Sequence, residues 1–340
     1  MRVLVLGGTG FIGPPVVDQL LAGGHDVAVL SRGATADELP ASVLRFRGDR
    51  KALADHARAL RSFRPDVVVD LILSSGAQAR DLMVVFRGVA RRVVALSSMD
   101  VYRACGVLHG LEPGPLEPVP LTEESPLRTR LQTYPPEQIK MLQGVFGWLD
   151  DEYDKIPVER EVMADAELPG TVLRLPMVYG PRDPLWRLLP VVKRVDDGRR
   201  VILLSESMAR WRGPRGYVEN VAAAVVLAAG SEAAAGRIYN VADPEPFTEL
   251  EWTRKVAEVA GWRGEVVVLP DDGSPAFLQA PGNPDQHWTA DSTRIRRELG
   301  YREPVPLDEA IARTIRWMRA HPPAGPTPHL FDYAAEDAVC

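Results

Sequence analysis

The fold of this chain is decided by the stretch Gly7-Gly8-Thr9-Gly10-Phe11-Ile12-Gly13. A short aliphatic run over 3–6 precedes it, and a helix-like stretch from about Phe11 to Ala22 follows. Glycine is needed where a chain turns tightly and where backbone must approach a pyrophosphate, and the following helix offers unpaired N–H groups to the phosphates. Because strand, loop and helix come in this order, the stretch predicts a dinucleotide-binding turn; the alternative is a tight turn with a purely structural role.

Aliphatic runs alternate with helix-like stretches through the first third of the chain. Strands are expected at 27–30, 67–71 and 92–96, and helices at 51–62 and 77–89. Strands that are apolar on both faces, separated by helices, indicate βαβ units, and the right-handed crossover rule then gives a doubly wound parallel sheet. We therefore predict an α/β chain, a Rossmann fold with a smaller, discontinuous C-terminal substrate domain.

The pattern is less regular after Tyr102. Glycines and prolines over 105–120 predict an irregular loop, and a helix is expected again at about 158–166. The tail 321–340 has few residues that could pack, so we expect it to be disordered or to lie over the surface. The predicted dinucleotide-binding domain covers 1–175 and about 215–242, and the predicted substrate-binding domain about 176–214 and 243–320.

Composition excludes several classes of protein. Forty basic against 46 acidic side chains, among 340 residues, give a formal net charge of -6, which disfavours binding to nucleic acid by phosphate neutralisation. Neither a signal pattern nor an apolar run long enough to span a membrane is present, so we expect a soluble, cytoplasmic chain. Cys105 and Cys340 are too few for a disulfide framework and have no zinc-ligand spacing nearby, so no metal is expected.

The end of the second predicted strand bears on the choice of cofactor. An acidic residue there would bond the ribose 2′-OH of NAD, but the chain has Ser31-Arg32-Gly33. A hydroxyl and a guanidinium suit a 2′-phosphate, so NADP is favoured over NAD. The alternative is that Arg32 is a solvated surface residue.

Six motifs in order carry a family resemblance. They are GGTGFIG (7–13), RGDR (47–50), SSMDVY (97–102), RLPMVYGP (174–181), RGYVENV (215–221) and YNV (239–241). The set resembles the extended short-chain dehydrogenase/reductase superfamily, NAD-dependent epimerase/dehydratase group, over about Met1 to Tyr301.

The resemblance implies a set of cofactor contacts. Asp49 would contact the adenine edge, Ser97 would lie beside the nicotinamide ribose, and Pro176 and Val178 would flank the nicotinamide; Asp49 could instead cap a helix at Lys51. The full implied set is Gly7, Thr9, Gly10, Phe11, Ile12, Gly13, Ser31, Arg32, Asp49, Arg50, Leu71, Ile72, Ser97, Pro176 and Val178.

The resemblance also implies substrate contacts. Arg215 would hold an anionic part of the substrate, although an interdomain ion pair is the alternative. Trp186 and Trp211 occur beside arginines, a composition that suits a nucleotide or another anionic aromatic group but is also common at seams between domains.

In this family a Ser or Thr, a Tyr and a Lys transfer the proton that accompanies hydride transfer. Ser98 is in the position of the hydroxyl, and Tyr153 is the best candidate for the phenol. The family spacing is Tyr-x-x-x-Lys, but Pro157 occupies the lysine position here and the nearest lysine is Lys155. On a regular helix Lys155 would face away from Tyr153; if the helix starts near Pro157, Lys155 can still approach the site.

Three interpretations of this motif stay open. In the first, Lys155 or another cation replaces the family lysine. In the second, the positive charge of an oxidised nicotinamide lowers the pKa of Tyr153 without a lysine. In the third, Tyr153 is a packed tyrosine, and the protein binds cofactor without turning it over.

Residues 132–148 have no counterpart that we can assign in the family. Tyr134, Phe146 and Trp148 could form a lid over the substrate. They could equally cover exposed sheet or form a subunit contact.

The leading prediction is therefore an NADP(H)- or NAD(H)-dependent oxidoreductase or epimerase that acts on a hydroxyl/carbonyl centre. A nucleotide sugar or similar anionic small molecule is the expected substrate, with no nucleic-acid or membrane partner, and a homodimer is expected. The alternative is a catalytically silent cofactor-binding sensor or scaffold.

Overall fold

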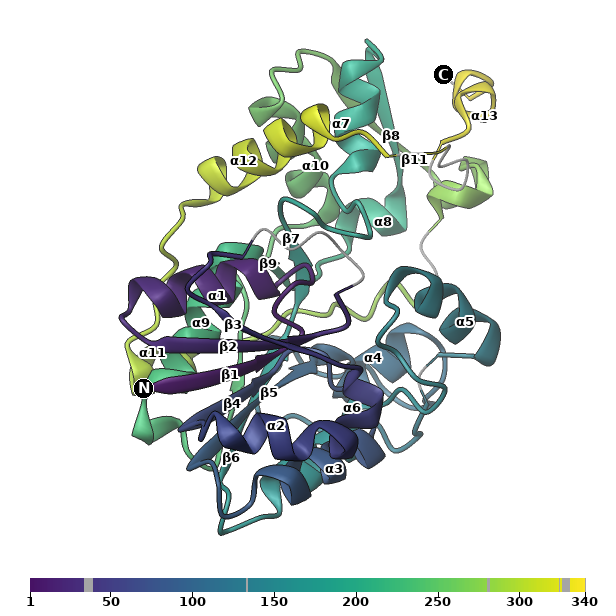
Figure 1. Cartoon of the computed structure of the whole chain (residues 1–340). Helices are drawn as coiled ribbons and strands as arrows, with labels where there is room; N and C mark the ends of the chain where they lie inside the picture. The colour runs from purple at the N-terminus through teal and green to yellow at the C-terminus, as the bar shows by residue number, and fades with distance from the viewer. Residues whose placement is uncertain (34–38, 133, 280–281, 324, 326–330, 340) are drawn as a thin grey trace.

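The computed structural model describes residues 1–33, 39–132, 134–279, 282–323, 325 and 331–339. Within these residues the centre of the molecule is a seven-stranded sheet with parallel neighbours throughout (Figure 1). The strand order is β10 (Arg237–Asn240), β6 (Gly170–Leu175), β5 (Arg92–Ser98), β4 (Val67–Asp70), β1 (Arg2–Leu6), β2 (Asp26–Ser31) and β3 (Leu44–Arg47). The predicted doubly wound α/β class is confirmed.

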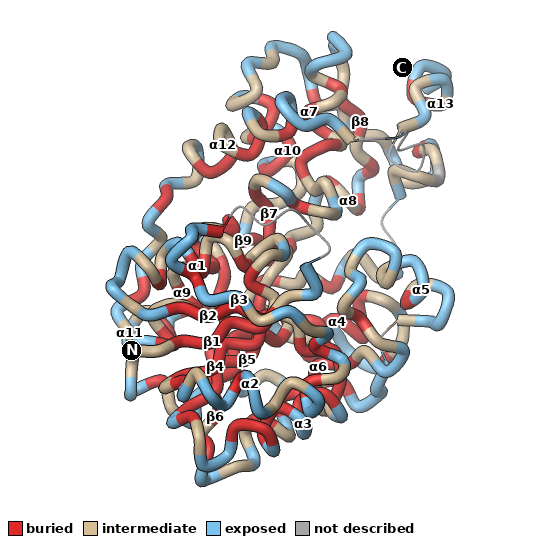
Figure 2. The backbone as a smooth tube through the Cα atoms, in the orientation of Figure 1, coloured by how far each residue is buried: buried red, intermediate tan, exposed pale blue. Residues whose placement is uncertain are grey.

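Helices cover both faces of this sheet. On one face lie α1 (Gly13–Ala22) and α9 (Val218–Gly230); on the other lie α2 (Ala57–Ser62), α3 (Gly76–Phe86) and α6 (Lys155–Met163). Alternate residues of a strand point to opposite faces, so Val3 packs in the cluster with α1 and Leu4 in the cluster with α3. Both faces are apolar, and the buried strands form the centre of Figure 2.

Two local predictions in this half were right only in part. The helix expected over 51–62 is a 3-10 segment, η1 (Arg50–His56), followed by α2, because Ala52 leaves the helical backbone region. The stretch 105–120, expected to be an irregular loop, begins inside α4 (Arg103–Leu108). The side chains of Ala104, Cys105 and Val107 are buried, and this packing stabilises a helix that the glycines and prolines further along do not favour.

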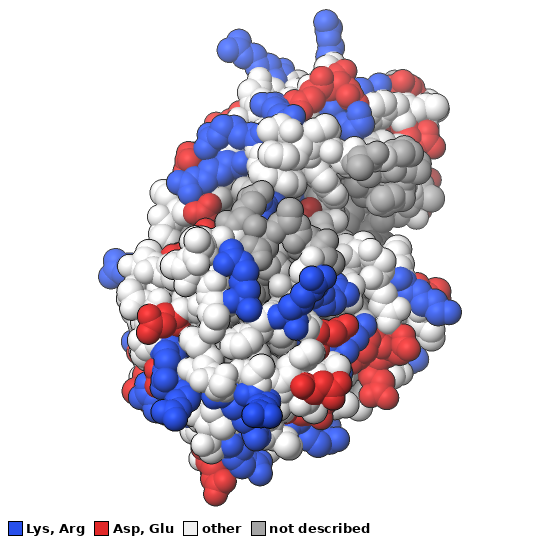
Figure 3. Space-filling view, in the orientation of Figure 1, with Lys and Arg blue, Asp and Glu red and all other residues white. Residues whose placement is uncertain are grey.

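The smaller lobe is built on two short parallel sheets. Strand β8 (Val201–Ser205) pairs with β11 (Glu265–Leu269), and β7 (Met177–Tyr179) pairs with β9 (Arg215–Tyr217). The helices around them are α7 (Leu189–Asp196), α8 (Glu206–Arg210), α10 (Glu249–Val259) and α12 (Leu307–Ala320), with the short turns η3 (Glu232–Ala234), η4 (Asp271–Gly273) and η5 (Ala276–Leu278) elsewhere in the chain. Basic and acidic side chains are interspersed over the face of the molecule seen in Figure 3.

Two segments near the C-terminus pack in specific places. Helix α11 (Thr293–Leu299) lies beside β10, where the Tyr239 hydroxyl donates to Glu298 at 3.0 Å. Helix α13 (Tyr333–Asp337) buries Glu336 completely in an ion pair with Arg194 of α7. The described part of the tail is therefore packed by a buried charge pair, which its low apolar content did not predict.

A buried polar network joins α6 to three strands of the sheet. The Arg174 guanidinium of β6 donates to both carboxylate oxygens of Glu159 on α6, at 2.9 and 2.7 Å. Glu159 also accepts from the Ser97 hydroxyl at 2.5 Å, and Arg174 donates to the Tyr102 hydroxyl at 2.9 Å. Tyr102 in turn donates to Asn240 of β10 at 2.6 Å. These charges are satisfied only while α6, β5, β6 and β10 keep their relative positions.

Truncation of one member of this network should destabilise the protein strongly. Glu159→Ala leaves the Arg174 guanidinium buried without its counter-charge, so we expect the free energy of unfolding to fall by about 3 kcal/mol, as measured by urea denaturation. Glu161→Ala, on the same helix but paired with an exposed arginine, is the control and should change stability little. Equal losses in the two variants would contradict this role for Glu159.

Candidate active site

The glycine loop is shaped so that side chains are excluded from it. Gly7 has φ +88°, and a Cβ added there would lie 2.6 Å from the Ile72 side chain. A Cβ on Gly13 would lie 2.3 Å from the backbone of Gly8, so α1 begins in close contact with the loop. On Gly10 the nearest atom to an added Cβ is the Gly7 carbonyl oxygen, at 3.6 Å. The loop is therefore tight on its inner side and open at Gly10, a cradle of backbone N–H groups at a helix N-terminus.

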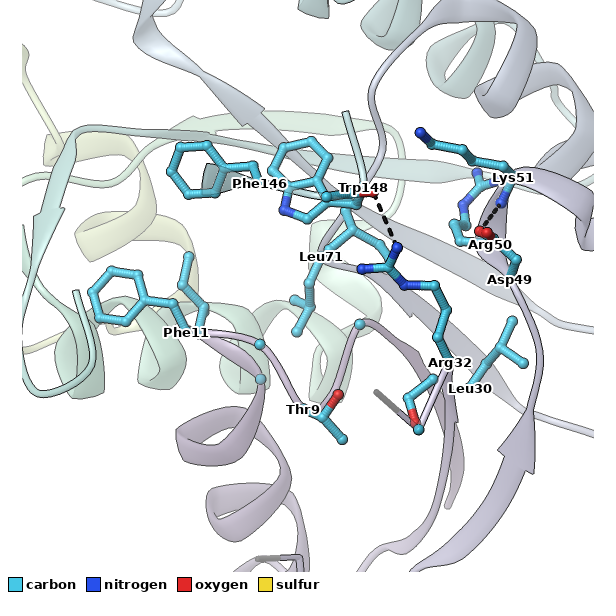
Figure 4. A pocket seen from close by; sticks show the side chains of 18 of the residues that line it. Thr9, Phe11, Leu30, Arg32, Asp49, Arg50, Lys51, Leu71, Phe146 and Trp148 are labelled. Atoms are coloured by element: carbon cyan, nitrogen blue, oxygen red, sulfur yellow. Dashed lines mark hydrogen bonds between the residues drawn. The ribbon is translucent and has the colours of Figure 1, made fainter. Parts of the chain in front are cut away.

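A pocket of about 330 Å³ lies against this loop (Figure 4). Its walls come from the glycine loop, the ends of β2 and β4, the segment before η1, and residues 145–148. The predicted cofactor residues that line it are Gly7, Thr9, Gly10, Phe11, Ile12, Gly13, Ser31, Arg32, Asp49, Arg50, Leu71 and Ile72. The other three predicted residues lie elsewhere: Ser97 in the buried network, Pro176 against Gly216, and Val178 in the core.

The charged residues of the pocket already have partners within the chain. Asp49 caps η1 by accepting from the Lys51 backbone N–H at 2.9 Å, the capping role that we had kept as the alternative. Arg50 donates from Nε to Asp70 at 2.7 Å and from Nη2 to the Gln78 carbonyl at 2.8 Å. Its Nη1 is buried and has no hydrogen-bond partner among the described residues. Arg32 is more exposed and donates to the Gly147 carbonyl at 3.3 Å.

Tyr153 and Ser98 both contact Asp100, a residue that the sequence analysis did not single out. The Tyr153 hydroxyl donates to Oδ2 of Asp100 at 3.1 Å, and the Asp100 backbone N–H donates to the Ser98 hydroxyl at 3.2 Å. Asp100 is 2% exposed, and its Oδ1 has no hydrogen-bond partner in the described part of the chain. Its position two residues after Ser98 was the only sequence signal that could have identified it.

Lys155 approaches Tyr153 because the helix starts later than the family spacing assumes. Asp154 is the N-cap of α6 and accepts from the Ile156 N–H at 2.8 Å, so Tyr153 lies before the helix. The Lys155 ammonium donates to the Leu73 carbonyl and, at 3.2 Å, to the Leu96 carbonyl. It lies 5.6 Å from the centre of the Tyr153 ring. Lys155 is therefore not turned away from Tyr153, as it would be if both residues lay on one regular helix. The alternative, in which Tyr153 lies outside the helix, matches the structure.

Burial and mutual charge shift the pKa values of these groups. Burial raises the pKa of Asp100, against the opposing effect of Arg128 and Lys155. Burial, followed by the charge of Asp100, raises the pKa of the Tyr153 phenol well above its usual value. Burial lowers the pKa of Lys155 to about 8, although Asp100 and other carboxylates favour its charged form. Near neutral pH the phenol thus holds its proton firmly, beside the Asp100 carboxyl group and the Lys155 amine.

Residues between α4 and α6 hold this cluster in place. Arg128 donates from Nε to the Asp100 carbonyl at 2.5 Å and pairs with Asp154 at 3.3 Å. The ring of Tyr134 lies 6.0 Å from that of Tyr153. The Tyr134 side chain therefore lies beside the cluster, whereas the aromatic residues 146 and 148 line the pocket of the glycine loop.

The residues predicted to bind substrate are engaged with other residues of the chain. Arg215 forms an ion pair with Glu249 of α10, and its guanidinium lies 4.6 Å from the centre of the Trp252 ring. Trp211 donates from its indole N–H to the Gln286 carbonyl at 3.1 Å. The Trp186 ring lies 5.7 Å from that of Trp317 on α12. The ion pair between Arg215 and Glu249 agrees with the alternative in which Arg215 pairs with an acidic side chain of this chain and not with a substrate.

Within the described residues, no group of three or more His, Cys, Asp and Glu side chains is arranged to hold a metal ion. None of the helices in the same residues is long and apolar enough to cross a membrane.

Comparison with known proteins agrees with the fold and the glycine loop. A reductase of Streptomyces sp, named 3-diazoavenalumate denitrifying reductase, is 29% identical over 275 residues, which cover 77% of this chain and 82% of that protein. A dTDP-glucose 4,6-dehydratase of Streptomyces griseus is 27% identical over 339 residues, 94% of each chain. The solved structure of the UDP-glucose 4-epimerase of Thermus thermophilus in complex with NAD is 28% identical, with a TM-score of 0.63 over 94% of this chain and all of that one.

The profile of one family matches the chain in two segments, residues 3–94 and 155–242, which hold the glycine loop, Lys155 and Arg174. Its description is NAD dependent epimerase/dehydratase family. The resemblance drawn from the six sequence motifs is thereby confirmed, and this chain belongs to the NAD-dependent epimerase/dehydratase family.

Proposed function

We propose that this chain is a nicotinamide-dependent oxidoreductase or epimerase that acts on a hydroxyl/carbonyl centre. The observation that carries the proposal is the contact between the Tyr153 phenol and the buried Asp100 carboxylate, with Lys155 beside them. This cluster lies near the carboxyl ends of β4 and β5, since Lys155 donates to the carbonyl of Leu73, just beyond β4, and to that of Leu96, near the end of β5. In open parallel sheets, ligands bind outside these carboxyl ends.

The pocket at the glycine loop fits a dinucleotide. Gly7 allows the tight turn and Gly10 leaves the loop open toward the pocket, and the orphaned Arg50 Nη1 is a buried donor in the same wall. The Thermus relative is described in complex with NAD, which supports the same class of cofactor here. Arg32, at the rim and after β2, favours NADP. When bound, the nicotinamide would donate or accept the hydride.

The residues of the cluster would manage the proton. Because its pKa is raised, Tyr153 is protonated at neutral pH, so it would meet a carbonyl oxygen as a phenol that can donate its proton and not as a phenolate base. The Ser98 hydroxyl would donate a hydrogen bond to the same oxygen. After the phenol has given up its proton, Asp100 in its protonated form would pass a proton to the phenolate and be left as a carboxylate that solvent reprotonates, and the Lys155 charge would stabilise the phenolate while it lasts.

The proposed substrate class rests on the relatives, because Arg215, the residue predicted to bind an anionic group, already pairs with Glu249. The three relatives described above are named for a dehydratase and an epimerase of nucleotide sugars and for a reductase, which supports a nucleotide sugar or a similar anionic metabolite. To bind the anionic part of such a substrate, Arg215 would have to release its ion pair with Glu249. A homodimer and a cytoplasmic location stay predictions.

A second candidate function is a catalytically silent cofactor-binding sensor. The raised pKa of Tyr153 favours it, because a phenol beside a carboxylate is a poor base for the oxidation of an alcohol. A tightly held cofactor that is never consumed would support this candidate, provided that product analysis excludes an epimerase that regenerates its cofactor.

Tyr153→Phe tests the proton relay. With UDP-glucose, dTDP-glucose and related keto sugars as the panel, turnover of any substrate found should fall by at least about 100-fold, while nucleotide affinity by calorimetry stays unchanged. Tyr333→Phe is the matched control, because its phenol also donates to a carboxylate, that of Asp197, but on the smaller lobe. Unchanged turnover in Tyr153→Phe would remove this residue from the mechanism.

Asp100→Asn tests the buried carboxylate through the pH dependence of stability. A folded-state pKa raised above the ordinary value means that wild-type stability is present at low pH and is lost as the pH rises through that pKa. The neutral amide avoids this loss, so the melting temperature of the variant minus that of wild type should be larger at pH 8 than at pH 4.5. The control is Asp151→Asn, a nearby exposed position. A difference independent of pH would contradict a raised pKa.

Arg32→Ala tests the choice of cofactor. Loss of the guanidinium should weaken binding of NADP by about ten-fold more than binding of NAD, as measured by calorimetry, because only NADP carries the 2′-phosphate. The exposed Arg58→Ala on α2 serves as the control. Equal weakening for the two nucleotides would argue against recognition of the 2′-phosphate by Arg32.

A further inference from the structure

The stretch 145–149 crosses one side of the glycine-loop pocket. It connects α5 (Pro136–Val145) to the turn before α6, and it lies in residues 95–154, between the two segments that match the family. In Figure 4 the side chains of Phe146 and Trp148 lie across the pocket from Thr9 and Phe11 of the glycine loop. We call residues 145–149 the strap.

One end of the strap is firmly attached. Leu149 is 3% exposed, and the carboxylate of the next residue, Asp150, accepts from Ser74 at 3.0 Å, from Ser75 at 2.7 Å and from Gln78 at 2.9 Å. These partners follow β4 and begin α3. The point at which the strap leaves the sheet is thus set by three hydrogen bonds to one carboxylate.

Across the pocket, two cations from the opposite wall hold the strap by its backbone. Arg32, after β2, donates to the Gly147 carbonyl at 3.3 Å, and Lys51, on η1, donates to the Leu149 carbonyl at 2.8 Å. Both cations line the pocket themselves. Since each bond joins an exposed side chain to a carbonyl, each is weak on its own and can open without disturbing the core.

The residues of the strap suit a pocket wall that contacts a bound ligand. Phe146 and Trp148 are half-buried, with ring centres 5.8 Å apart, and both face the pocket with apolar surface. Flat aromatic side chains gain free energy when a flat aromatic group such as a nucleotide base covers them. Gly147 allows a close approach of Arg32, because even a Cβ there would lie 3.0 Å from the guanidinium.

The strap also reaches the acid/base cluster. The centre of the Trp148 ring lies 5.3 Å from the Lys155 ammonium, which lies beside Tyr153. A displacement of the strap therefore removes a neighbour of the charge on which the proton relay depends.

From these contacts we infer that the strap is part of the dinucleotide site and retains the bound nicotinamide dinucleotide, with Lys51 and Arg32 as its latches. The inference rests on the proposed function, because it takes the dinucleotide as the ligand of the pocket. Release of the nucleotide requires the latches to open, so the strap sets the dissociation rate more than the association rate.

The test compares release of NADH from wild type, Lys51→Met and Phe146→Ala by stopped-flow fluorescence. Both variants should release NADH about five- to ten-fold faster, with a smaller change in the association rate. NADH lacks the 2′-phosphate, and Phe146 has no charge, so neither effect can come from a lost bond to that phosphate. Lys140→Met, an exposed lysine on α5, is the control and should release NADH at the wild-type rate.

A second readout follows the strap itself. Quenching of tryptophan fluorescence by bound NADH should be smaller in Trp148→Phe than in wild type, whereas Trp317→Phe, in the smaller lobe, should keep most of it. If wild type binds the nucleotide but Lys51→Met and Phe146→Ala release it at the wild-type rate, the strap is a passive wall and the inference is wrong. If wild type binds neither NAD(H) nor NADP(H), the proposed function fails, and the strap inference fails with it.

Discussion

The buried ion pair between Glu159 and Arg174 is the constraint on which the site depends. Both groups are almost fully withdrawn from water, so each needs the other as its counter-charge. Glu159 must therefore face the sheet, and this sets the rotation of α6 about its own axis. Lys155 lies four residues earlier, on the same side of that helix, so its ammonium points to the ends of β4 and β5. The cation beside Tyr153 is thus a consequence of a charge pair one helical turn away.

The segments that match the family model and most of the candidate acid/base residues lie in different parts of the sequence. The segments that match the family, 3–94 and 155–242, supply the glycine loop, the sheet and Lys155. Ser98, Asp100, Tyr153 and the strap lie between them. A rigid parallel sheet presents its carboxyl ends whatever the loops contain, so loops can change the chemistry while the cofactor pocket is kept. The glycine loop thus lies inside the family match, and most of the acid/base cluster lies outside it.

Several features of the site could be anticipated residue by residue, and others could not. The glycine loop and the place of Arg32 after a strand, both of which line the pocket, could be predicted because a backbone turn and the end of a strand have local signatures. Asp100 was missed because a carboxylate two residues after Ser98 has no meaning until the fold brings the distant Tyr153 phenol to it. The strap was recognised as an insertion, but its attachment to Arg32 and Lys51 depends on contacts between distant segments.

The sequence by itself determined the class of fold and the position of the glycine loop, because apolar strands, helix periodicity and a glycine turn are all local properties of the chain. Only the tertiary structure decided how Tyr153 and Lys155 lie relative to each other. Spacing on an ideal helix separated them, but the helix begins at Lys155 with Asp154 as its cap, and burial against the sheet brings the ammonium to the phenol ring. Where a helix starts, and which charges are buried together, depends on the packing of segments far apart in sequence, and no local pattern records it.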